Sequence, residues 1–384
     1  MNIVHTILIV MLLLPWKAHA AGKTLVAVVE NPGSFERKSE TVVVPLETVR
    51  HKLRGVDVSR LAVIDRKAGT IVTSQTTPDE LLFKADFKSR ERKTFIIRQS
   101  EGEGAVPETL VDGRYVLPRE DYAWENDRIA FRMYGPALAA EVNNGIDVWT
   151  KRVRSLVVAK WYKESEGSLP GKDTYHQDRG EGADFFAVGR SLGAGGSGIW
   201  QNGKVWQPGV FSSYTTLCNG PIRVAFELTY ATWNIDGKKF TERKRISLDA
   251  GENLNRIEVS FAGLPPTYRV QIACGLVKRN YTAVSTGKLR RWMSLWGLTT
   301  SDSANGSLGT GVVLPTAIPA TFAEDNDQYF LIAKAVPGSH FTYYAGAGWT
   351  RSGDFATSAD WEAYLTNFLR RLDVPLKLSI TVQE

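Results

Sequence analysis

Short apolar runs separated by polar turns recur along almost the whole chain, and they constrain the fold more than any other feature of the sequence. The runs are rich in Val, Ile and Thr, which is typical of β-strands. From Arg256 to Phe261 every second residue is apolar, as expected for a sheet with one face in water. The pattern predicts an all-β protein with strands near Leu25–Val29, Thr41–Val44, Leu61–Ile64, Gly69–Val72, Thr94–Ile97, Ile129–Tyr134, Leu156–Trp161, Ile222–Tyr230, Phe240–Leu248, Asn255–Phe261, Arg269–Leu276, Gly309–Val313, Tyr329–Ala335 and Leu376–Val382.

One late helix is predicted over Ser358–Leu372, where apolar residues follow an i, i+3, i+4, i+7, i+8 stripe. Arginines lie in its last turn and Pro375 follows, as at many helix ends. The segment Ser100–Pro107 is the predicted linker. We therefore expect a small amino-terminal β-sandwich over residues 21–99, followed by a large antiparallel sandwich over 108–384.

Residues 1–20 are predicted to be an export signal, because the apolar run Ile7–Leu14 is followed by small residues at Ala18–Ala20. This run is too short to span a bilayer, and no later segment is apolar enough. We therefore expect a periplasmic or secreted protein without membrane insertion. Only two cysteines are present, Cys218 and Cys274, and their spacing leaves open whether they pair.

The formal net charge of +6 is spread among acidic residues rather than gathered in a block. Such scattering argues against a nucleic-acid surface. An anionic carbohydrate fits better, because guanidinium groups pair well with carboxylates. Oligomeric state is left open by the sequence.

The segment 124–136 is the first of three that could carry chemistry. If Ile129–Tyr134 is a strand, Arg128, Arg132 and Tyr134 share one face. Two guanidiniums could then bind a carboxylate, and the phenol could move a proton. The alternative is a solvated strand face whose arginines are neutralised by nearby acids.

The segment 160–189 contains more candidate residues than the first. Tyr175 and His176 stand before a run of acids, and on an extended chain His176 and Asp178 face the same way, with Glu181 able to curl back between glycines. These three residues are candidates either for acid–base work or for ligation of a divalent metal ion. The remaining alternative is a charged surface loop bent by glycines.

Aromatic side chains that could stack on sugar rings accompany these segments. Trp124 and Trp161 belong to the first two, and the third, 338–353, holds His340, Trp349 and Arg351 between glycines. His340 is a second candidate for proton transfer. Core packing is the competing role for each tryptophan.

Paired carboxylates keep a second reaction open. A glycosidase needs two, and Glu125 with Asp127, Asp178 with Glu181, or one acid from each pair could supply them. The chain has no G-x-S-x-G segment, which argues against an esterase of the α/β-hydrolase type.

Four segments together resemble a family of exported bacterial proteins, the domain of unknown function numbered 4861. They are Asn31–Arg37, Trp124–Gly135, Tyr175–Gly196 and His340–Trp349. The resemblance implies an association with degradation of uronic-acid polysaccharides such as pectin and ulvan, and with an oligosaccharide dehydratase activity. It also implies that the second part is a β-supersandwich similar to that of galactose-mutarotase-like proteins.

We therefore expect a carbon–oxygen lyase that eliminates across C4–C5 of a uronic acid in an oligosaccharide. The alternatives are a glycoside hydrolase and a non-catalytic carbohydrate-binding protein. Elimination requires neutralisation of the substrate carboxylate, a base at C5 and an acid at the leaving oxygen. The candidates are Arg128, Arg132 or a metal ion for the first role, His176 or Tyr134 for the second, and Tyr134, Tyr175 or His340 for the third, with Trp124, Trp161, Trp349 and Arg351 as further substrate contacts.

Overall fold

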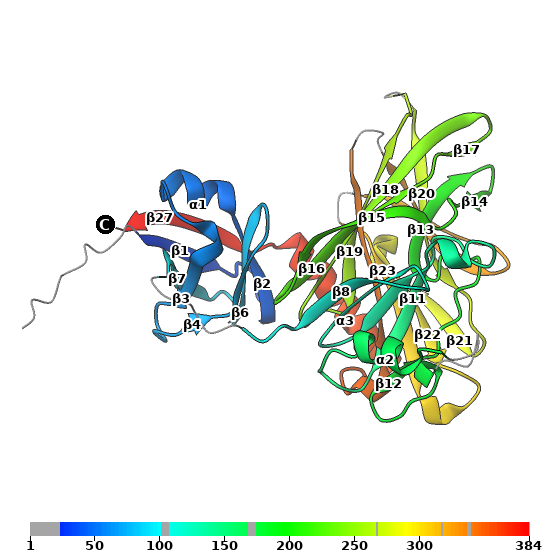
Figure 1. The fold of residues 1–384 in the computed structure, drawn as a ribbon, viewed down its shortest axis with the longest axis horizontal. Coiled ribbons are helices and arrows are strands. Elements are labelled where there is room, and N and C mark those ends of the chain that lie inside the picture. Colours follow the sequence, from blue (N-terminus) through cyan, green and yellow to red (C-terminus); the bar gives the residue numbers. More distant parts are fainter. Residues whose placement is uncertain are drawn as a thin grey trace, which may run out of the picture.

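A computed structural model describes residues 24–100, 107–167, 174–265, 268–315, 318–335 and 339–383. These residues form a small and a large body that lie side by side along the long axis of the molecule (Figure 1). The predicted export signal, 1–20, lies outside the described residues, as does most of the predicted linker.

The small body is a β-sandwich. Inward-facing residues of its two sheets share one apolar core, in which the rings of Phe83 and Phe95 are 4.6 Å apart. One sheet has the order β27-β1-β7-β3-β4 and the other β2-β6-β5. The strands are β1 (Thr24–Glu30), β2 (Arg37–Pro45), β3 (Leu61–Asp65), β4 (Ile71–Val72), β5 (Ser74–Thr76), β6 (Glu80–Phe87), β7 (Arg92–Gln99) and β27 (Lys377–Gln383).

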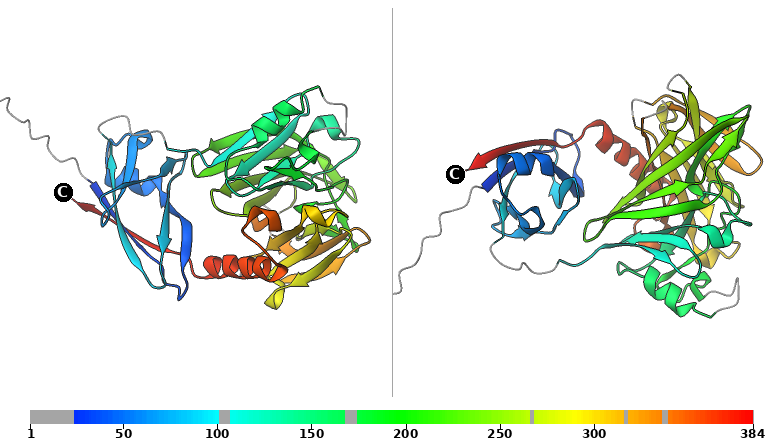
Figure 2. Two further views of the ribbon diagram at one scale, coloured as in Figure 1. Left: turned by 90° about the horizontal axis from the view of Figure 1, so that it is seen from below. Right: turned by 45° about the horizontal axis from the view of Figure 1, so that its top comes forward.

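The last strand corrects the expected domain boundary. β27 pairs antiparallel with β1 from Thr24↔Gln383 to Glu30↔Lys377, so the end of the chain returns to the small body (Figure 2). The expectation that 108–384 forms one unit is wrong for these residues. The pairing joins segments from the two ends of the chain, and local sequence patterns carry no information on such a partner.

The large body contains a nine-stranded sheet, β15-β16-β18-β19-β26-β23-β22-β21 with β17 paired to β18, and two five-stranded sheets, β12-β11-β10-β9-β8 and β14-β13-β20-β25-β24. Its strands are β8 (Val111–Val116), β9 (Asp121–Asn126), β10 (Ala130–Met133), β11 (Ile146–Lys151), β12 (Gly182–Asp184), β13 (Ala194–Gln201), β14 (Lys204–Trp206), β15 (Phe211–Asn219), β16 (Arg223–Tyr230), β17 (Trp233–Ile235), β18 (Lys238–Asp249), β19 (Leu254–Ala262), β20 (Val270–Val277), β21 (Thr282–Thr286), β22 (Trp292–Leu298), β23 (Ser307–Val313), β24 (Ala320–Glu324), β25 (Gln328–Ala335) and β26 (Phe341–Trp349).

The two five-stranded sheets form one layer opposite the nine-stranded sheet. A bridge between Ile146 and Gly193 joins them at their shared boundary. Residues from all three sheets, such as Phe131, Phe226 and Ile272, belong to a single core. The arrangement is the expected β-supersandwich, and the all-β prediction is confirmed. Within it Cys218 and Cys274 are both free thiols.

The predicted late helix is α3 (Ser358–Asp373). Thr357 and Asp360 form a capping box at its start, and Trp361, Leu365 and Phe368 are buried against the large body. The other helices are short: α1 (Leu46–Lys52), α2 (Val158–Glu164) and the 3₁₀ turns η1 (Val58–Arg60), η2 (Pro136–Leu138), η3 (Thr174–His176), η4 (Lys288–Arg290), η5 (Ser303–Asn305) and η6 (Thr350–Ser352). No helix in the described part of the chain is long and apolar enough to cross a membrane.

Helix α2 occupies part of a predicted strand, Leu156–Trp161, so that prediction is wrong. The buried Glu125 carboxylate accepts hydrogen bonds from the backbone N–H groups of Val157 (2.8 Å) and Val158 (2.7 Å). These donors have no partner within a helix, and an acceptor supplied by another element stabilises the start of α2. That acceptor is about thirty residues away in sequence, beyond the reach of a local pattern.

Candidate active site

Arg132 in β10 lies at the centre of a buried polar group. Its neighbours Phe131 and Met133 point into the sandwich core, so strand alternation directs Arg132 to the outer face of the sheet. Side chains of α2 and η3 cover that face, and only 5% of Arg132 is exposed. A buried guanidinium is costly unless it is paired and hydrogen-bonded.

Carboxylates from three other strands meet this guanidinium. Arg132 Nε donates to Asp147 Oδ2 at 2.8 Å, from the position directly opposite in β11. Its Nη2 donates to Asp184 Oδ2 in β12 at 2.8 Å. Asp121 Oδ2 in β9 lies 3.8 Å from Nη1. The charge of Arg132 is therefore matched inside the protein.

Aromatic hydroxyls complete the group. Arg132 Nη2 donates to Tyr134 Oη at 3.1 Å, and Nη1 lies 3.4 Å from Tyr175 Oη. The Tyr175 ring stacks on Trp149 with centroids 4.6 Å apart, and the Tyr162 hydroxyl donates to Asp121 at 3.0 Å. Tyr175 is 3% exposed, whereas Tyr134 is only half-buried.

His176 lies at the outer edge of this group, with 40% of its side chain exposed. Its Nδ1 is 3.0 Å from the backbone oxygen of Asp184 and 3.6 Å from Asp184 Oδ2. Because a carbonyl oxygen only accepts, Nδ1 carries the proton, and in the neutral ring Nε2 has the lone pair. Asp184 thus connects the imidazole to Arg132, and Arg132 connects Asp184 to Tyr134.

Gly182 allows this arrangement. Its φ of +119° suits glycine, and a Cβ there would lie 2.0 Å from the Thr150 carbonyl oxygen in β11. Only glycine lets β12 approach β11 this closely. The close approach brings Asp184, two residues later, beside Arg132.

Burial sets the protonation of these groups. It raises the pKa of the Asp121 carboxyl to about 6, with Arg132 opposing the shift. Burial and the neighbouring Asp147 raise the pKa of Asp184 well above its usual range. They also raise the pKa of the Tyr134 phenol, so Tyr134 is protonated at neutral pH. Arg132 lowers the pKa of Tyr134, but burial outweighs this effect.

Two arginines approach Asp178, which follows His176 by two residues in the chain. Arg152 at the end of β11 and Arg351 in η6 approach the same carboxylate, Asp178, at 3.1 and 3.8 Å. About a third of each arginine side chain is exposed. Two guanidiniums near one carboxylate leave this region with an excess of positive charge.

Arg128 does not join Arg132. It lies before β10 rather than within it and pairs with Asp127 and Asp354. Arg154 donates to the same Asp354, at 2.8 Å. The predicted Arg128–Arg132 carboxylate clamp is therefore wrong, because each guanidinium has its own acidic partners.

The predicted metal ligands do not lie together in one site. Asp178 pairs with Arg152, and Glu181 with Lys160 at 2.8 Å. Across the described residues, no three His, Cys, Asp or Glu side chains form a group that could hold a metal ion. The predicted site of His176, Asp178 and Glu181 is wrong, because each acid is bound to a neighbouring cation.

The predicted tryptophan platforms are core residues. Trp124 and Trp349 are 0% and 1% exposed, and their indole N–H groups donate to Asn255 Oδ1 and the Asn305 carbonyl. Trp161 lies in α2, is 4% exposed and stacks on Trp149 with ring centroids 5.6 Å apart. Stacking on sugars by these residues is excluded by burial.

His340 is exposed but remote from the group. It precedes β26, whereas Trp349 ends that strand near η6. The eight residue spacings of β26, from Phe341 to Trp349, extend over roughly 26 Å, so His340 lies far from η6. The structure therefore brings His176, Tyr134, Tyr175 and Arg132 together and leaves His340 out.

The carboxylate pairs considered for hydrolysis are also occupied. Glu125 is 1% exposed, and Lys151 Nζ donates to it at 2.6 Å. The Asp127 carboxylate accepts from the backbone of Gly251 at 2.6 Å and pairs with Arg128. These partners fix both acids as structural groups.

Several residues of the site were not predicted. Asp147, Asp184 and Arg152 reach it from β11 and β12, whose neighbours in the sheet the sequence does not reveal. One feature of the sequence could have identified Asp147 as a residue of the site. Asp147 is an acid in the apolar run Ile146–Trp149, where a buried charge requires a partner.

Comparison with known proteins gives the family. The model of a domain of unknown function, DUF4861, matches residues 29–378. The chain belongs to this family. The DUF4861 match begins and ends at Val29 and Leu378, which pair with each other across β1 and β27, so the family unit includes both bodies.

One similar protein has about the same length as this chain, and a second is about twice as long. The chain is 32% identical over 376 residues to "Uncharacterized protein P7" of Formosa agariphila, and the alignment covers 92% of each protein. Among solved structures, a protein in the glycosyl hydrolase family 38 from Enterococcus faecalis is similar with a TM-score of 0.49 and 11% identity. The match covers 94% of this chain and 48% of that protein, so this chain spans about half its length.

Proposed function

We propose that this DUF4861 protein is an exported, periplasmic or secreted, carbohydrate-active enzyme that eliminates across C4–C5 of a uronic acid in an oligosaccharide. One observation carries the proposal: Asp184 and Arg132 connect the His176 imidazole to the Tyr134 hydroxyl, at 3.6, 2.8 and 3.1 Å along the series. A histidine oriented through Nδ1 and a protonated phenol are a base and an acid held in one framework.

In the proposed reaction His176 Nε2 removes the C5 proton. The C5–H electrons form the C4–C5 double bond while the C4–O bond breaks. The leaving oxygen takes the Tyr134 proton and departs as water or as the hydroxyl of a shorter sugar. Proton transfer from His176 to Tyr134 then restores both groups.

Neutralisation of the substrate carboxylate falls to Arg152 and Arg351. The C5 proton is removable only if the negative charge that develops on the substrate carboxylate in the transition state is stabilised. Arg132 and Arg128 are committed to aspartates, whereas Arg152 and Arg351 share one. Their guanidiniums are partly exposed and approach Asp178, two residues after His176 in the chain, and a guanidinium can bind a carboxylate through two hydrogen bonds.

The buried residues have positioning roles in this scheme. Arg132 holds the Tyr134 hydroxyl, and Asp184 orients the His176 ring. Tyr175 is almost completely buried and stacks on Trp149, which supports the guanidinium rather than reaching the substrate.

The test is ultraviolet absorbance of the purified protein with uronate oligosaccharides from pectin and ulvan. A rising signal from a conjugated unsaturated uronate supports elimination, and mass spectrometry then separates loss of water from chain cleavage. New saturated fragments without absorbance would indicate hydrolysis and contradict the proposal. Unchanged sugars across both substrate sets would also count against it.

A further inference from the structure

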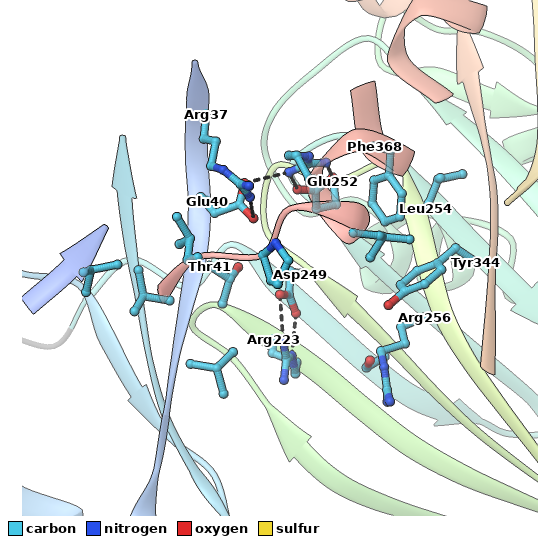
Figure 3. Close-up of a pocket in the computed structure, with 18 of the residues that line it drawn as sticks. Arg37, Glu40, Thr41, Arg223, Asp249, Glu252, Leu254, Arg256, Tyr344 and Phe368 are labelled. Atoms are coloured by element: carbon cyan, nitrogen blue, oxygen red, sulfur yellow. Dashed lines mark hydrogen bonds and ion pairs between the residues drawn. The ribbon is translucent and has the colours of Figure 1, made fainter. Parts of the chain in front are cut away.

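A groove separates the small body from the outer face of the nine-stranded sheet. It consists of two clefts of about 390 and 430 Å³ that share Val43, Arg223, Ser247 and Arg256 along their boundary. Figure 3 shows the first cleft, with residues of β2 on one side and of β16, β18, β19 and β26 on the other. The sheet residues point away from the sandwich core, so the groove and the Arg132 group lie on opposite layers of the large body.

Contacts between the bodies fix the walls of the groove. The Gln75 side chain accepts from the backbone N–H groups of Ile222 (2.8 Å) and Arg223 (2.7 Å) and donates to the Arg223 carbonyl (2.9 Å). Half-buried Lys84 donates to the Ala250 carbonyl at 2.8 Å. These hydrogen bonds hold the two bodies in one orientation, which gives a pre-formed site.

The first cleft has one apolar wall. Leu254, Phe368 and the Tyr344 ring form it, and the rings of Tyr344 and Phe368 meet edge to face at 4.9 Å. Among its polar residues Arg371 and Glu252 are paired with each other, since Arg371 donates to Glu252 at 2.6 Å. This cleft can receive the apolar face of a ring.

The second cleft offers a guanidinium without a partner. Arg245 in β18 is exposed, and in the described part of the chain it has no hydrogen bond or ion pair. Glu258 stands directly opposite it in β19 but is bound by Arg256. Glu227 stands opposite Arg245 in β16 and lies 3.8 Å from Arg243. An acidic group entering here would therefore meet Arg245 with no protein carboxylate in an ion pair with it.

We propose that this groove is an accessory site for an acidic oligosaccharide, with a uronate carboxylate on Arg245 and a sugar ring against Tyr344. The choice of a uronate chain rests on the proposed function. From β16 to β26 the groove crosses three strand spacings, about 14 Å. That length suits more than one sugar unit. Because it lies on the layer opposite His176, it would hold the polymer without taking part in the reaction.

The experiment is a calorimetric titration of the full chain with a trimer of galacturonic acid, in a His176→Ala background that stops the proposed reaction. Arg245→Gln should weaken a saturable component by at least about tenfold, as expected for one lost charge-assisted contact. The control is Arg114→Gln, since Arg114 is an exposed arginine on the other layer of the large body and does not line the groove. It should leave the titration unchanged.

Maltotriose tests whether a neutral sugar binds, and triglutamate tests whether negative charge without a sugar binds. Both should bind at least about tenfold more weakly than the uronate trimer. Equal binding of triglutamate, equal effects of the two arginine variants, or no Arg245-dependent component would overturn the accessory site. Absence of turnover in the wild-type chain would instead contradict the proposed function, because this titration does not depend on a reaction.

Discussion

The Arg132 guanidinium donates to the Asp184 carboxylate at 2.8 Å, and both side chains are at most 6% exposed. Desolvation of such a pair is expensive, and only a complete set of partners offsets it. Asp147 and Tyr134 supply partners for the guanidinium. The same set connects the His176 imidazole with the Tyr134 hydroxyl, so stability and the proposed chemistry depend on one network.

Removal of Arg132 should destabilise the fold strongly. Arg132→Leu leaves Asp147 and Asp184 buried without their cation, and we expect a loss of about 3–5 kcal/mol in the free energy of unfolding. Chemical denaturation measures it. The matched control is Arg114→Leu, two strands away on the same sheet, because Arg114 forms an exposed pair with Asp112. The control should change stability by less than about 1 kcal/mol. Similar losses for both variants would contradict the buried network.

Asp121 should make stability depend on pH. Its folded pKa of about 6 exceeds the ordinary value of 3.8, so the folded state favours the protonated carboxyl. The associated stability is fully present below pH 3.8 and is lost as pH rises through 6. The loss amounts to about 3 kcal/mol, at ~1.4 kcal/mol per pKa unit.

The comparison with Asp121→Asn isolates this effect. Other acids, such as Asp249, have lowered pKa values despite burial, because Arg223 is close, and they contribute the opposite slope. We therefore expect the difference between wild type and Asp121→Asn to shift in favour of the variant from pH 4 to pH 7. A constant difference, measured by urea unfolding at each pH, would show that Asp121 does not titrate there.

Glu242 and Lys244 form a second buried pair, 3.2 Å apart inside the sandwich. Lys244→Met alone leaves a buried carboxylate and should cost about 3–5 kcal/mol. The double variant Glu242→Leu with Lys244→Met removes both charges and should recover most of that loss. Additive losses in thermal or chemical unfolding would contradict this. Glu227→Gln, which removes an exposed ion pair with Arg243, is the neutral control.

The fold was largely predictable from the sequence where local patterns decide it. Alternation identified strands such as β19, and the apolar stripe with its terminal arginines identified α3 almost to the residue. Both signals depend on residues a few positions apart. The sandwich architecture follows from them, because strands with one apolar face must bury it against another sheet.

The rest depends on partners distant in sequence. β27 pairs with β1 from the other end of the chain, and α2 starts where Glu125 supplies acceptors to Val157. The site, too, depends on contacts between residues that are distant in sequence. Arg132, Tyr134, Tyr175 and His176 were identified as candidates, but their burial and the aspartates that hold them follow from tertiary contacts alone. The predicted metal site, arginine clamp and tryptophan platforms were wrong for this reason.

Tyr134→Phe should remove the proposed acid and leave the proposed base, His176, in place. The variant keeps the ring on Arg132 but loses the hydroxyl, so we expect elimination to fall by about 10²–10⁴-fold. Substrates with a better leaving group at C4 should be affected less, because they need less help from an acid. Equal losses for good and poor leaving groups would assign Tyr134 a merely structural role.

The most direct test of the account compares two exposed histidines. His176→Ala should lower the rate of unsaturated-uronate formation, followed by ultraviolet absorbance, by about 10²–10⁴-fold while changing stability by about 1 kcal/mol or less. His340→Ala, at the far end of β26, should leave the rate unchanged. Retained activity in the His176 variant, or an equal loss in both, would contradict the assignment of His176 as the base.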